Sequence, residues 1–124
     1  MKYDMIIAED DAILREIYLR KFDHKKFTIR TAANGEEVLK LLSEKEPLLL
    51  LLDINMPVID GIEVLKKLPK AKRHFSVIML TNLDAPDMKQ EAEKLGADGY
   101  FVKKSMTLES LLKMSEDLLS RQES

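Results

Sequence analysis

The segment that most constrains the fold is PLLLLLDINMPVIDG, residues 47–61, in which five consecutive leucines end at Asp53. A strand that is buried on both faces forms a continuous apolar run, because neither of its alternating sets of side chains meets water. A run of this length suits a strand and is far shorter than the roughly 20 residues that a membrane-spanning helix requires. We therefore expect a central strand of a parallel sheet here, with the carboxylate of Asp53 at its carboxyl end.

Four further apolar runs alternate with segments of helical spacing along the chain. The five expected strands are Tyr3–Ala8, Phe27–Ala32, Leu48–Leu52, Phe75–Leu80 and Gly99–Val102. Strands that alternate with helices predict an α/β fold, a doubly wound parallel sheet with helices on both faces. The chain has 124 residues, 45% of them hydrophobic, and contains no internal repeat or linker, so we expect residues 1–124 to form a single domain.

Helix signals separate the expected strands. In the first helical segment, four apolar residues have the spacing of one helix face: Leu14, Ile17, Tyr18 and Phe22. Residues that commonly cap helices precede four of the segments, namely Asp11, Asn34, Asp60 and Thr107. Glu37 follows Asn34 in the pattern of a capping box, and Pro86 stands in the first turn of the fourth helix. We expect the second, third and fourth helices to stop at Pro47, Pro69 and Gly96.

The composition excludes several classes of function. Twenty basic and 22 acidic residues leave a net charge of -2, and no basic patch stands out, so nucleic-acid binding is not predicted. The chain has no cysteine, which excludes disulfides and thiolate metal sites and fits a reducing compartment. The N-terminus MKYDMIIAEDD has too short an apolar stretch between its charges for a signal peptide. We expect a cytoplasmic protein that does not contact a membrane.

Reactive side chains follow four of the expected strands. Glu9 and Asp10 follow the first strand, Asp53 the third, Thr81 the fourth and Lys103 the fifth. Ligands of open parallel sheets bind outside the carboxyl ends of the strands. We therefore expect three carboxylates to crowd one crevice, facing a hydroxyl and an ammonium group.

Such a cluster of carboxylates indicates a bound cation and phosphoryl chemistry. Two carboxylates about 4 Å apart repel by on the order of 4 kcal/mol at an effective dielectric constant of about 20. Mg²⁺ would offset this repulsion, since it prefers oxygen ligands and completes its shell with water and phosphate oxygens. An aspartate can itself attack a phosphoryl group and form an aspartyl phosphate. Thr81 and Lys103 would then hold the phosphoryl oxygens.

Four stretches of sequence together resemble the receiver domain of two-component response regulators. They are AEDD after the first strand, LLLLDINMPVIDG around the third, VIMLTN at the fourth and LGADGYFVKKS at the fifth. The resemblance extends from Tyr3 to about Leu119. It implies the flavodoxin-like receiver fold, with five strands in the order 2-1-3-4-5 and five helices.

The resemblance also implies roles for the acidic residues. Asp53 corresponds to the phosphoacceptor. Asp10 and Asp53 correspond to direct ligands of Mg²⁺, Glu9 acts on the metal through water, and Asn55 supplies a backbone carbonyl. Phosphorylation in the family depends on this metal ion.

Further residues and the partners follow from the same resemblance. Thr81 and Lys103 correspond to the residues that contact the phosphoryl group, and Tyr100 to an aromatic switch residue. A histidine kinase or histidine phosphotransfer protein would donate the phosphoryl group. A downstream effector protein or domain would recognise the face formed by the last two helices and the last strand. Such a protein is a phosphorelay signalling switch that catalyses only its own phosphorylation and dephosphorylation.

The chain departs from the family pattern at three positions. Lys103 is followed by Lys104, whereas the family usually has a proline there after a cis bond. A cis bond before a residue other than proline costs about 2.5–4 kcal/mol, so we expect a trans bond. Asn82 replaces a residue that is often small, which narrows access to an acyl phosphate, and Leu83 offers no polar group to orient water.

Other interpretations of the same residues remain. Metal-dependent phosphatases that form an aspartyl phosphate often carry a second aspartate two residues after the first, but this chain has Asn55 there. A receiver-like scaffold that binds a partner without being phosphorylated is the third possibility, and the missing proline leaves it open. Taken singly, Asp53 is also compatible with an ordinary solvated strand end, and Tyr100 with a static core aromatic.

Overall fold

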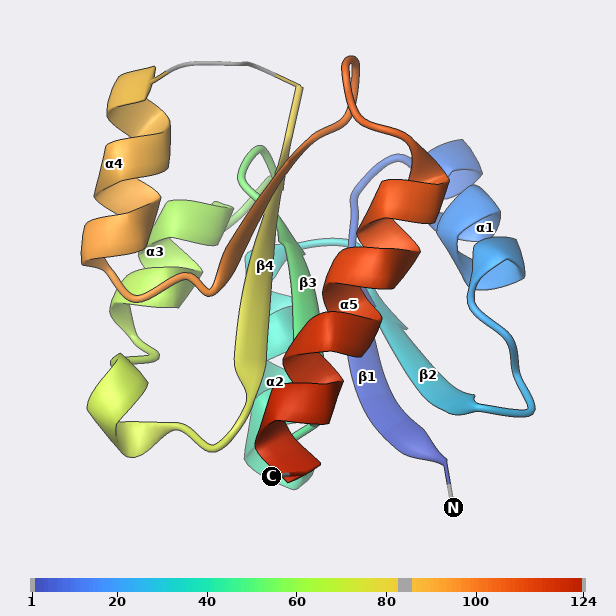
Figure 1. The fold of residues 1–124 in the computed structure, drawn as a ribbon. Coiled ribbons are helices and arrows are strands. Elements are labelled where there is room, and N and C mark those ends of the chain that lie inside the picture. Colours follow the sequence, from blue (N-terminus) through green and yellow to red (C-terminus); the bar gives the residue numbers. More distant parts are fainter. Residues whose placement is uncertain (1, 83–85, 124) are drawn as a thin grey trace.

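A five-stranded parallel sheet lies between two layers of helices in the computed structural model, which describes residues 2–82 and 86–123 (Figure 1). The strands are β1 Tyr3–Ala8, β2 Phe27–Ala32, β3 Leu49–Asp53, β4 Ser76–Thr81 and β5 Gly99–Val102. Their order is β2-β1-β3-β4-β5, and all neighbouring pairs are parallel, as the sequence predicts. All five strands therefore end at the same edge of the sheet.

In the described part of the chain, five α-helices cover the sheet. They are α1 Ala12–Lys21, α2 Gly35–Glu44, α3 Gly61–Lys66, α4 Pro86–Lys94 and α5 Leu108–Glu123, and a 3₁₀ turn lies at Lys70–Lys72. Helices α1 and α5 lie on one face of the sheet, and α2, α3 and α4 lie on the other (Figure 1). Within the described residues, no helix combines the length and apolarity needed to cross a membrane.

The expected helix caps are present. Side-chain oxygens of Asp11, Asn34, Asp60 and Thr107 each accept a hydrogen bond from a backbone N–H in the first turn of the helix that follows. The capping box of α2 is modified, because Glu37 Oε1 accepts from the N–H of Ala33 rather than from that of Asn34. Each cap satisfies backbone donors that would otherwise lack a partner.

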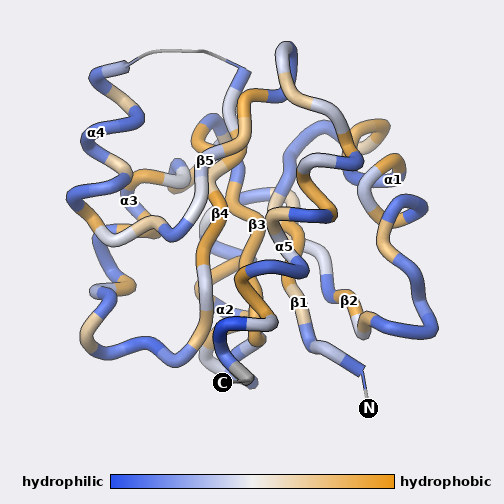
Figure 2. Tube along the Cα trace, in the orientation of Figure 1, coloured by the Kyte–Doolittle hydropathy of each residue, from blue (hydrophilic) through white to orange (hydrophobic). Residues whose placement is uncertain are grey.

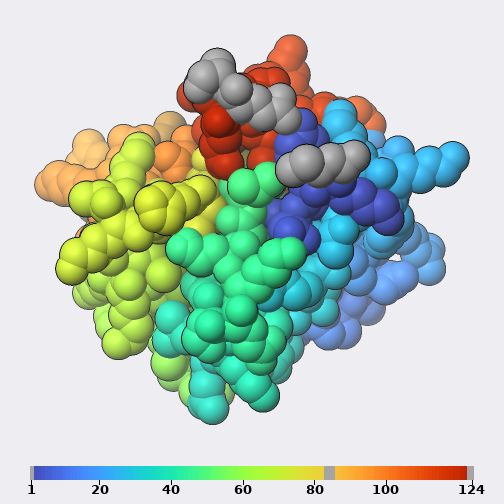
Figure 3. Space-filling view, turned by 90° about the horizontal axis from the view of Figure 1, so that it is seen from below, coloured from blue at the N-terminus to red at the C-terminus, as the bar shows by residue number. Residues whose placement is uncertain are grey.

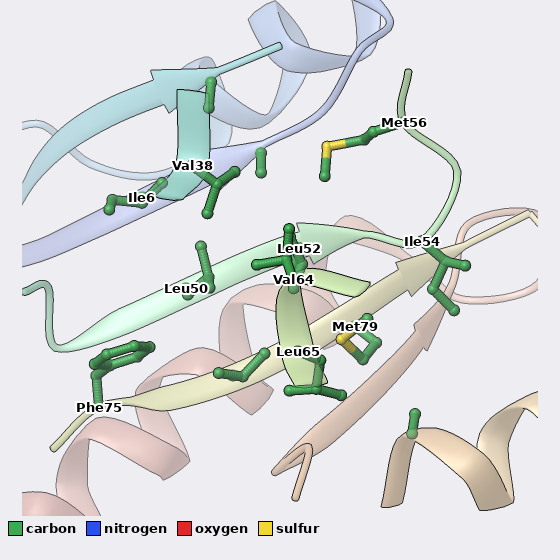
Figure 4. Packing of buried hydrophobic residues seen from close by; sticks show 14 residues of the cluster. Ile6, Val38, Leu50, Leu52, Ile54, Met56, Val64, Leu65, Phe75 and Met79 are labelled. Atoms are coloured by element: carbon green, nitrogen blue, oxygen red, sulfur yellow. The ribbon is translucent and has the colours of Figure 1, made fainter. Parts of the chain in front are cut away.

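The leucine run is a central strand buried on both faces. Leu50 and Leu52 belong to the apolar cluster under α2, α3 and α4, whereas Leu49 and Leu51 belong to the cluster under α1 and α5. Figure 4 shows Leu50 and Leu52 among the first of these clusters, and Figure 2 shows apolar residues along the strands between the helix layers. All four leucines are fully buried, which explains why the run does not alternate with polar residues.

Some boundaries and faces differ from the expectation. β3 and β4 are each displaced by one residue toward the C-terminus, because their register pairs Leu49 with Ser76 and Asp53 with Leu80. α3 ends at Lys66, before Pro69, since its last turn tightens into hydrogen bonds between residues three apart.

The first helix was expected to bury one more side chain than it does. Tyr18 and Phe22 are buried and Leu14 packs against their cluster, but Ile17 is 39% exposed. Ile17 lies at the border of the apolar stripe, about 100° around the helix from Tyr18, and is therefore partly exposed to solvent.

A buried guanidinium group fastens the amino-terminal end of the sheet. The side chain of Arg73 is only 3% exposed, donates to the carbonyl oxygens of Leu68, Phe75 and Gly96, and pairs with Asp98 at 2.9 Å. Asp98 in turn accepts a hydrogen bond from the N–H of Val77. Segments before β4 and β5 are thus joined through one side chain.

The charge of Asp98 is stabilised by these contacts. Burial alone would raise its pKa, but the hydrogen bond from the N–H of Val77 and those from Lys70 and Arg73 outweigh it. The pKa of Asp98 is therefore lowered from its ordinary value, and its carboxylate is ionised at neutral pH.

Arg73→Met should lower the free energy of unfolding by about 3–5 kcal/mol, because it leaves the Asp98 carboxylate and several carbonyl groups without their buried partner. Urea denaturation followed by circular dichroism measures this loss. The matched variant Lys72→Met removes an exposed charge from the neighbouring position and should change stability by no more than about 0.5 kcal/mol. Equal, small effects of both variants would contradict the role of Arg73.

Candidate functional site

Three carboxylates lie together at the carboxyl-terminal edge of the sheet. Glu9 and Asp10 follow β1, and Asp53 is the last residue of β3, the neighbouring strand. One oxygen from each residue lies within 4.8 Å of the others. Glu9 and Asp53 are 0% and 2% exposed, whereas Asp10 is exposed. The cluster is therefore buried on the protein side and open to solvent at Asp10.

An ammonium group from the last strand joins two of these carboxylates. Lys103 Nζ lies 2.5 Å from Glu9 Oε1 and 2.9 Å from Asp53 Oδ2. The N–H of Lys103 donates to the carbonyl oxygen of Thr81 at 2.7 Å, which aligns the chain after β5 with the end of β4. Side chains from the ends of β1, β3 and β5 thus meet, and the end of β4 joins them through the backbone of Thr81.

The peptide bond after Lys103 is trans, in agreement with the expectation, since none of the described peptide bonds is cis. The lysine that follows, Lys104, is exposed. Lys103 therefore reaches the carboxylates without the proline that is usual in the resembled family.

The turn after β3 holds the other oxygen of Asp53. Asp53 Oδ1 accepts a hydrogen bond from the N–H of Asn55 at 3.0 Å, and the side chain of Asn55 is exposed. The start of α3 packs directly against this turn, where Gly61 donates to the carbonyl oxygen of Ile54. A Cβ at Gly61 would lie 2.2 Å from the carbonyl oxygen of Asp53, so only glycine permits this approach.

Burial and charge perturb the ionisation of Glu9. Its pKa is raised to about 8, first by burial and then by the neighbouring Asp53, while Lys103 acts in the opposite direction. For Lys103 itself, burial would lower the pKa, but Glu9 and Asp53 outweigh burial and raise it. At neutral pH Lys103 is therefore charged, and Glu9 is largely protonated when no metal ion is bound.

Two further residues, Arg15 and Tyr18, are not connected with the site by the sequence analysis. Arg15 Nη1 donates to the carbonyl oxygen of Glu9 at 2.7 Å and so braces the turn between β1 and α1. The buried Tyr18 lies within the field of the cluster, and its pKa is raised by burial and by the charges of Glu9 and Asp53. The position of Arg15, four residues after the helix cap Asp11, was the only sequence feature that could have indicated its contact with the turn after β1.

The remaining predicted residues lie close to this edge. Thr81 is fully buried at the end of β4, and the next residue, Asn82, is exposed. Leu83 lies outside the described residues. Tyr100 pairs with Met79 across β4 and β5, packs against the cluster under α2, α3 and α4, and has its hydroxyl oxygen shielded from solvent.

Comparison with known protein families matches residues 5–116 to the response regulator receiver domain. Sporulation initiation phosphotransferase F of Bacillus subtilis is 33% identical over 103 residues, which make up 83% of this chain and 83% of that protein. The alkaline phosphatase synthesis transcriptional regulatory protein PhoP of the same organism is also 33% identical over 103 residues. These residues cover 83% of this chain but only 43% of PhoP.

Comparison of the fold with solved structures also finds receiver domains of response regulators. The receiver domain of the Francisella response regulator 1452 is 29% identical and superposes with a TM-score of 0.88, over 97% of this chain and 98% of that one. These matches agree with the resemblance carried by the four strand ends.

The stability of the metal-free protein should depend on pH through Glu9. Between its ordinary pKa of 4.5 and about 8, Glu9 binds a proton in the folded state but not in the unfolded state. The free energy of unfolding should therefore fall as the pH rises through this window, by at most about 1.4 kcal/mol per pH unit.

Asp53→Asn should reduce this fall, because it removes a charge that raises the pKa of Glu9. In the presence of a chelator, the variant should melt at a higher temperature than the natural protein at about pH 9, and the difference should shrink at about pH 6. Asp23→Asn, which alters an exposed loop acid, serves as the control and should show no such pH-dependent gain. A lower melting temperature for Asp53→Asn at both pH values would contradict the repulsion within the cluster.

Proposed function

The chain belongs to the response regulator receiver domain family, and we propose that Asp53 is its phosphoacceptor. Members of this family act as signalling switches and are in general phosphorylated on an aspartate. The observation that carries the proposal is the placement of Asp53, a carboxylate 2% exposed whose two oxygens are held by Lys103 and by the N–H of Asn55. A buried carboxylate with fixed oxygens is oriented for attack.

The proposed donor is a phosphohistidine of a histidine kinase or a histidine phosphotransfer protein. A carboxylate oxygen of Asp53 attacks phosphorus, a P–O bond forms, and the P–N bond breaks with its electron pair going to the imidazole, which takes a proton from solvent. Water later attacks phosphorus, which releases inorganic phosphate and restores the carboxylate. We propose that the protein acts catalytically only on its own phosphorylation state.

The acidic cluster fits the Mg²⁺ that receiver domains generally use. Hard carboxylate oxygens within 4.8 Å of one another are the donors that Mg²⁺ prefers, and the exposed Asp10 leaves the cluster open toward solvent. We propose that Asp10 and Asp53 hold the ion directly, Glu9 through water, and Asn55 through its backbone carbonyl. The bound ion would neutralise charge on the phosphoryl oxygens.

Two further side chains are proposed to hold the phosphoryl group. Lys103 already contacts the Oδ2 atom of Asp53, so its ammonium group would lie beside an oxygen of a phosphoryl group attached there. The hydroxyl of Thr81 lies at the end of the neighbouring strand β4. Together they would balance the negative charge that phosphorylation adds.

Tyr100 is proposed as the switch that carries this change to a downstream effector protein or domain. It belongs to β5, three residues before Lys103, and its ring contacts the apolar cluster. A shift of Thr81 toward the phosphoryl group would alter the space next to this ring. The face formed by α4, β5 and α5 would then differ between the two states.

Three wider assignments belong to the same proposal. We propose that residues 1–124 form one receiver domain, that it acts in the cytoplasm, and that this domain does not itself contact nucleic acid. The absence of cysteine supports the cytoplasmic location, and the net charge of -2 supports the absence of nucleic-acid contact.

The proposal about nucleic acid concerns this domain alone. The relative PhoP is by name a transcriptional regulatory protein, and it is more than twice as long as the part this chain matches.

Incubation with Mg²⁺ and acetyl phosphate should add the mass of one phosphoryl group to the intact protein. Chelation of Mg²⁺ and Asp53→Asn should each abolish the gain. Asp11→Asn is the matched control, because Asp11 is an acid of the same turn as Glu9 but caps α1, and this variant should still be phosphorylated.

Two results would overturn the assignment. A phosphoryl adduct that persists in Asp53→Asn would place the acceptor at another residue. The absence of any adduct in the natural protein would favour a scaffold that only binds a partner, and rapid turnover of phosphate monoesters would favour a phosphatase.

A further inference from the structure

An apolar groove of about 340 Å³ lies between α2 and the chain that follows α3. We call it the α2–α3 groove. Its apolar lining consists of Leu39 and Leu42 from α2 and of Leu68, Pro69 and Phe75 from the opposite side. In the view from below, residues near the end of α2 (teal) and residues around 70 (lime) lie on the same face of the molecule (Figure 3).

The leucines that line the groove are only partly buried by the core. Leu39, Leu42 and Leu68 pack against the buried cluster but are themselves only half-buried, and they leave apolar surface in contact with water. Three such side chains gathered in one hollow differ from the single exposed apolar residues that are normal on protein surfaces.

Free cationic groups line one wall of the groove. Residues 66–73 read KKLPKAKR, five basic residues without an acidic one, in a chain whose net charge is -2. Lys66 pairs with Glu63, and Lys70 and Arg73 pair with Asp98.

Three cations line the groove, and among the described residues two of them, Lys67 and Lys72, lack such partners. Lys67 and Lys72 are both exposed, and within residues 2–82 and 86–123 neither ammonium group has a hydrogen-bond or ion-pair partner. The opposite wall carries one acidic residue, Glu46. The groove therefore presents an apolar floor between a cationic wall and a weakly acidic one.

The groove and the acidic cluster lie at opposite ends of the sheet. Glu46 precedes β3, and Pro69 and Phe75 precede β4, so the groove adjoins the amino ends of these strands. Asp53 ends β3 at the other edge. A molecule bound in the groove would leave Asp53 accessible to a phosphoryl donor.

We propose that the α2–α3 groove is a docking site for an acidic amphipathic helix of a partner protein, and that this helix binds whether or not Asp53 is modified. Apolar anchors spaced by three or four residues would enter the floor, and acidic residues along one flank would face Lys67 and Lys72. The apolar floor argues against nucleic acid, whose binding depends chiefly on contacts between cations and phosphates. The partner would hold the protein near its site of action while phosphorylation proceeds at the other end.

The test uses a synthetic helical peptide with leucines at positions i, i+4 and i+7 and glutamates along one flank. Methyl NMR should show shifts confined to the groove leucines, above all Leu39, Leu42 and Leu68. Mg²⁺ with beryllofluoride should leave the affinity unchanged within about twofold. Because the groove does not involve Asp53, peptide binding and the methyl shifts can be measured even if Asp53 is not phosphorylated.

Charge-reversal variants distinguish binding in the groove from nonspecific electrostatic attraction between the peptide and the protein. The double variant Lys67→Glu and Lys72→Glu should weaken peptide binding at least about tenfold. The double variant Lys25→Glu and Lys89→Glu alters exposed lysines outside the groove by the same charge and should retain the affinity.

Several outcomes would overturn the proposal. They are equal weakening by both double variants, equal binding of a peptide with lysines in place of the glutamates, methyl shifts located outside the groove, and tighter binding of a short DNA duplex than of the peptide at the same salt concentration. Loss of the peptide on addition of beryllofluoride would contradict docking that is independent of modification.

Discussion

Burial of β3 on both of its faces determines where the reactive side chains lie. Leu49 and Leu51 face one helix layer, Leu50 and Leu52 face the other, and no residue of the strand reaches solvent before the sheet ends. The carboxylate of Asp53 therefore leaves the sheet into a space that is still protected from water. A carboxylate in such a place is costly unless it is paired, and the ammonium group of Lys103 supplies the partner.

The contacts of the Lys103 ammonium group connect parts of the chain that are distant in sequence. Glu9 follows the first strand and Lys103 the last, and both meet Asp53 from the central strand. Any reaction that changes the charge of Asp53 would also change the partners of Lys103 and Glu9. The ends of β1, β3 and β5 are thus linked through one ammonium group.

Much of this arrangement was predictable, because it follows from the topology of the sheet. Parallel strands end at one edge and β1 lies beside β3, so the residues after these two strands had to lie close together once the strands were identified. Lys103 follows β5, which β4 separates from β3, and it reaches the carboxylates through its long side chain. Side-chain partners across the fold were not predictable. Arg73 and Asp98 are 25 residues apart and follow no local spacing rule, and their pair exists only because the segments before β4 and β5 lie side by side.

The sequence-based predictions also failed for residues at the edge of an apolar helix face and at the ends of strands. Ile17 has the spacing of a buried residue, yet its exposure depends on how α1 is rotated against the sheet. The ends of β3 and β4 depend on their mutual register, which a single sequence does not contain. The α2–α3 groove likewise arises from the separation of two elements whose apolar residues each look like ordinary core.

A crystal structure of the protein with Mg²⁺ and beryllofluoride would test the assignment of Asp53 most directly. Beryllofluoride mimics a phosphoryl group attached to a carboxylate. We expect beryllium bonded to an oxygen of Asp53, Mg²⁺ between this group and the carboxylates after β1, and the ammonium group of Lys103 moved from Glu9 to a fluorine atom. Beryllofluoride bound at another side chain, or Lys103 still paired with both Glu9 and Asp53, would contradict the assignment.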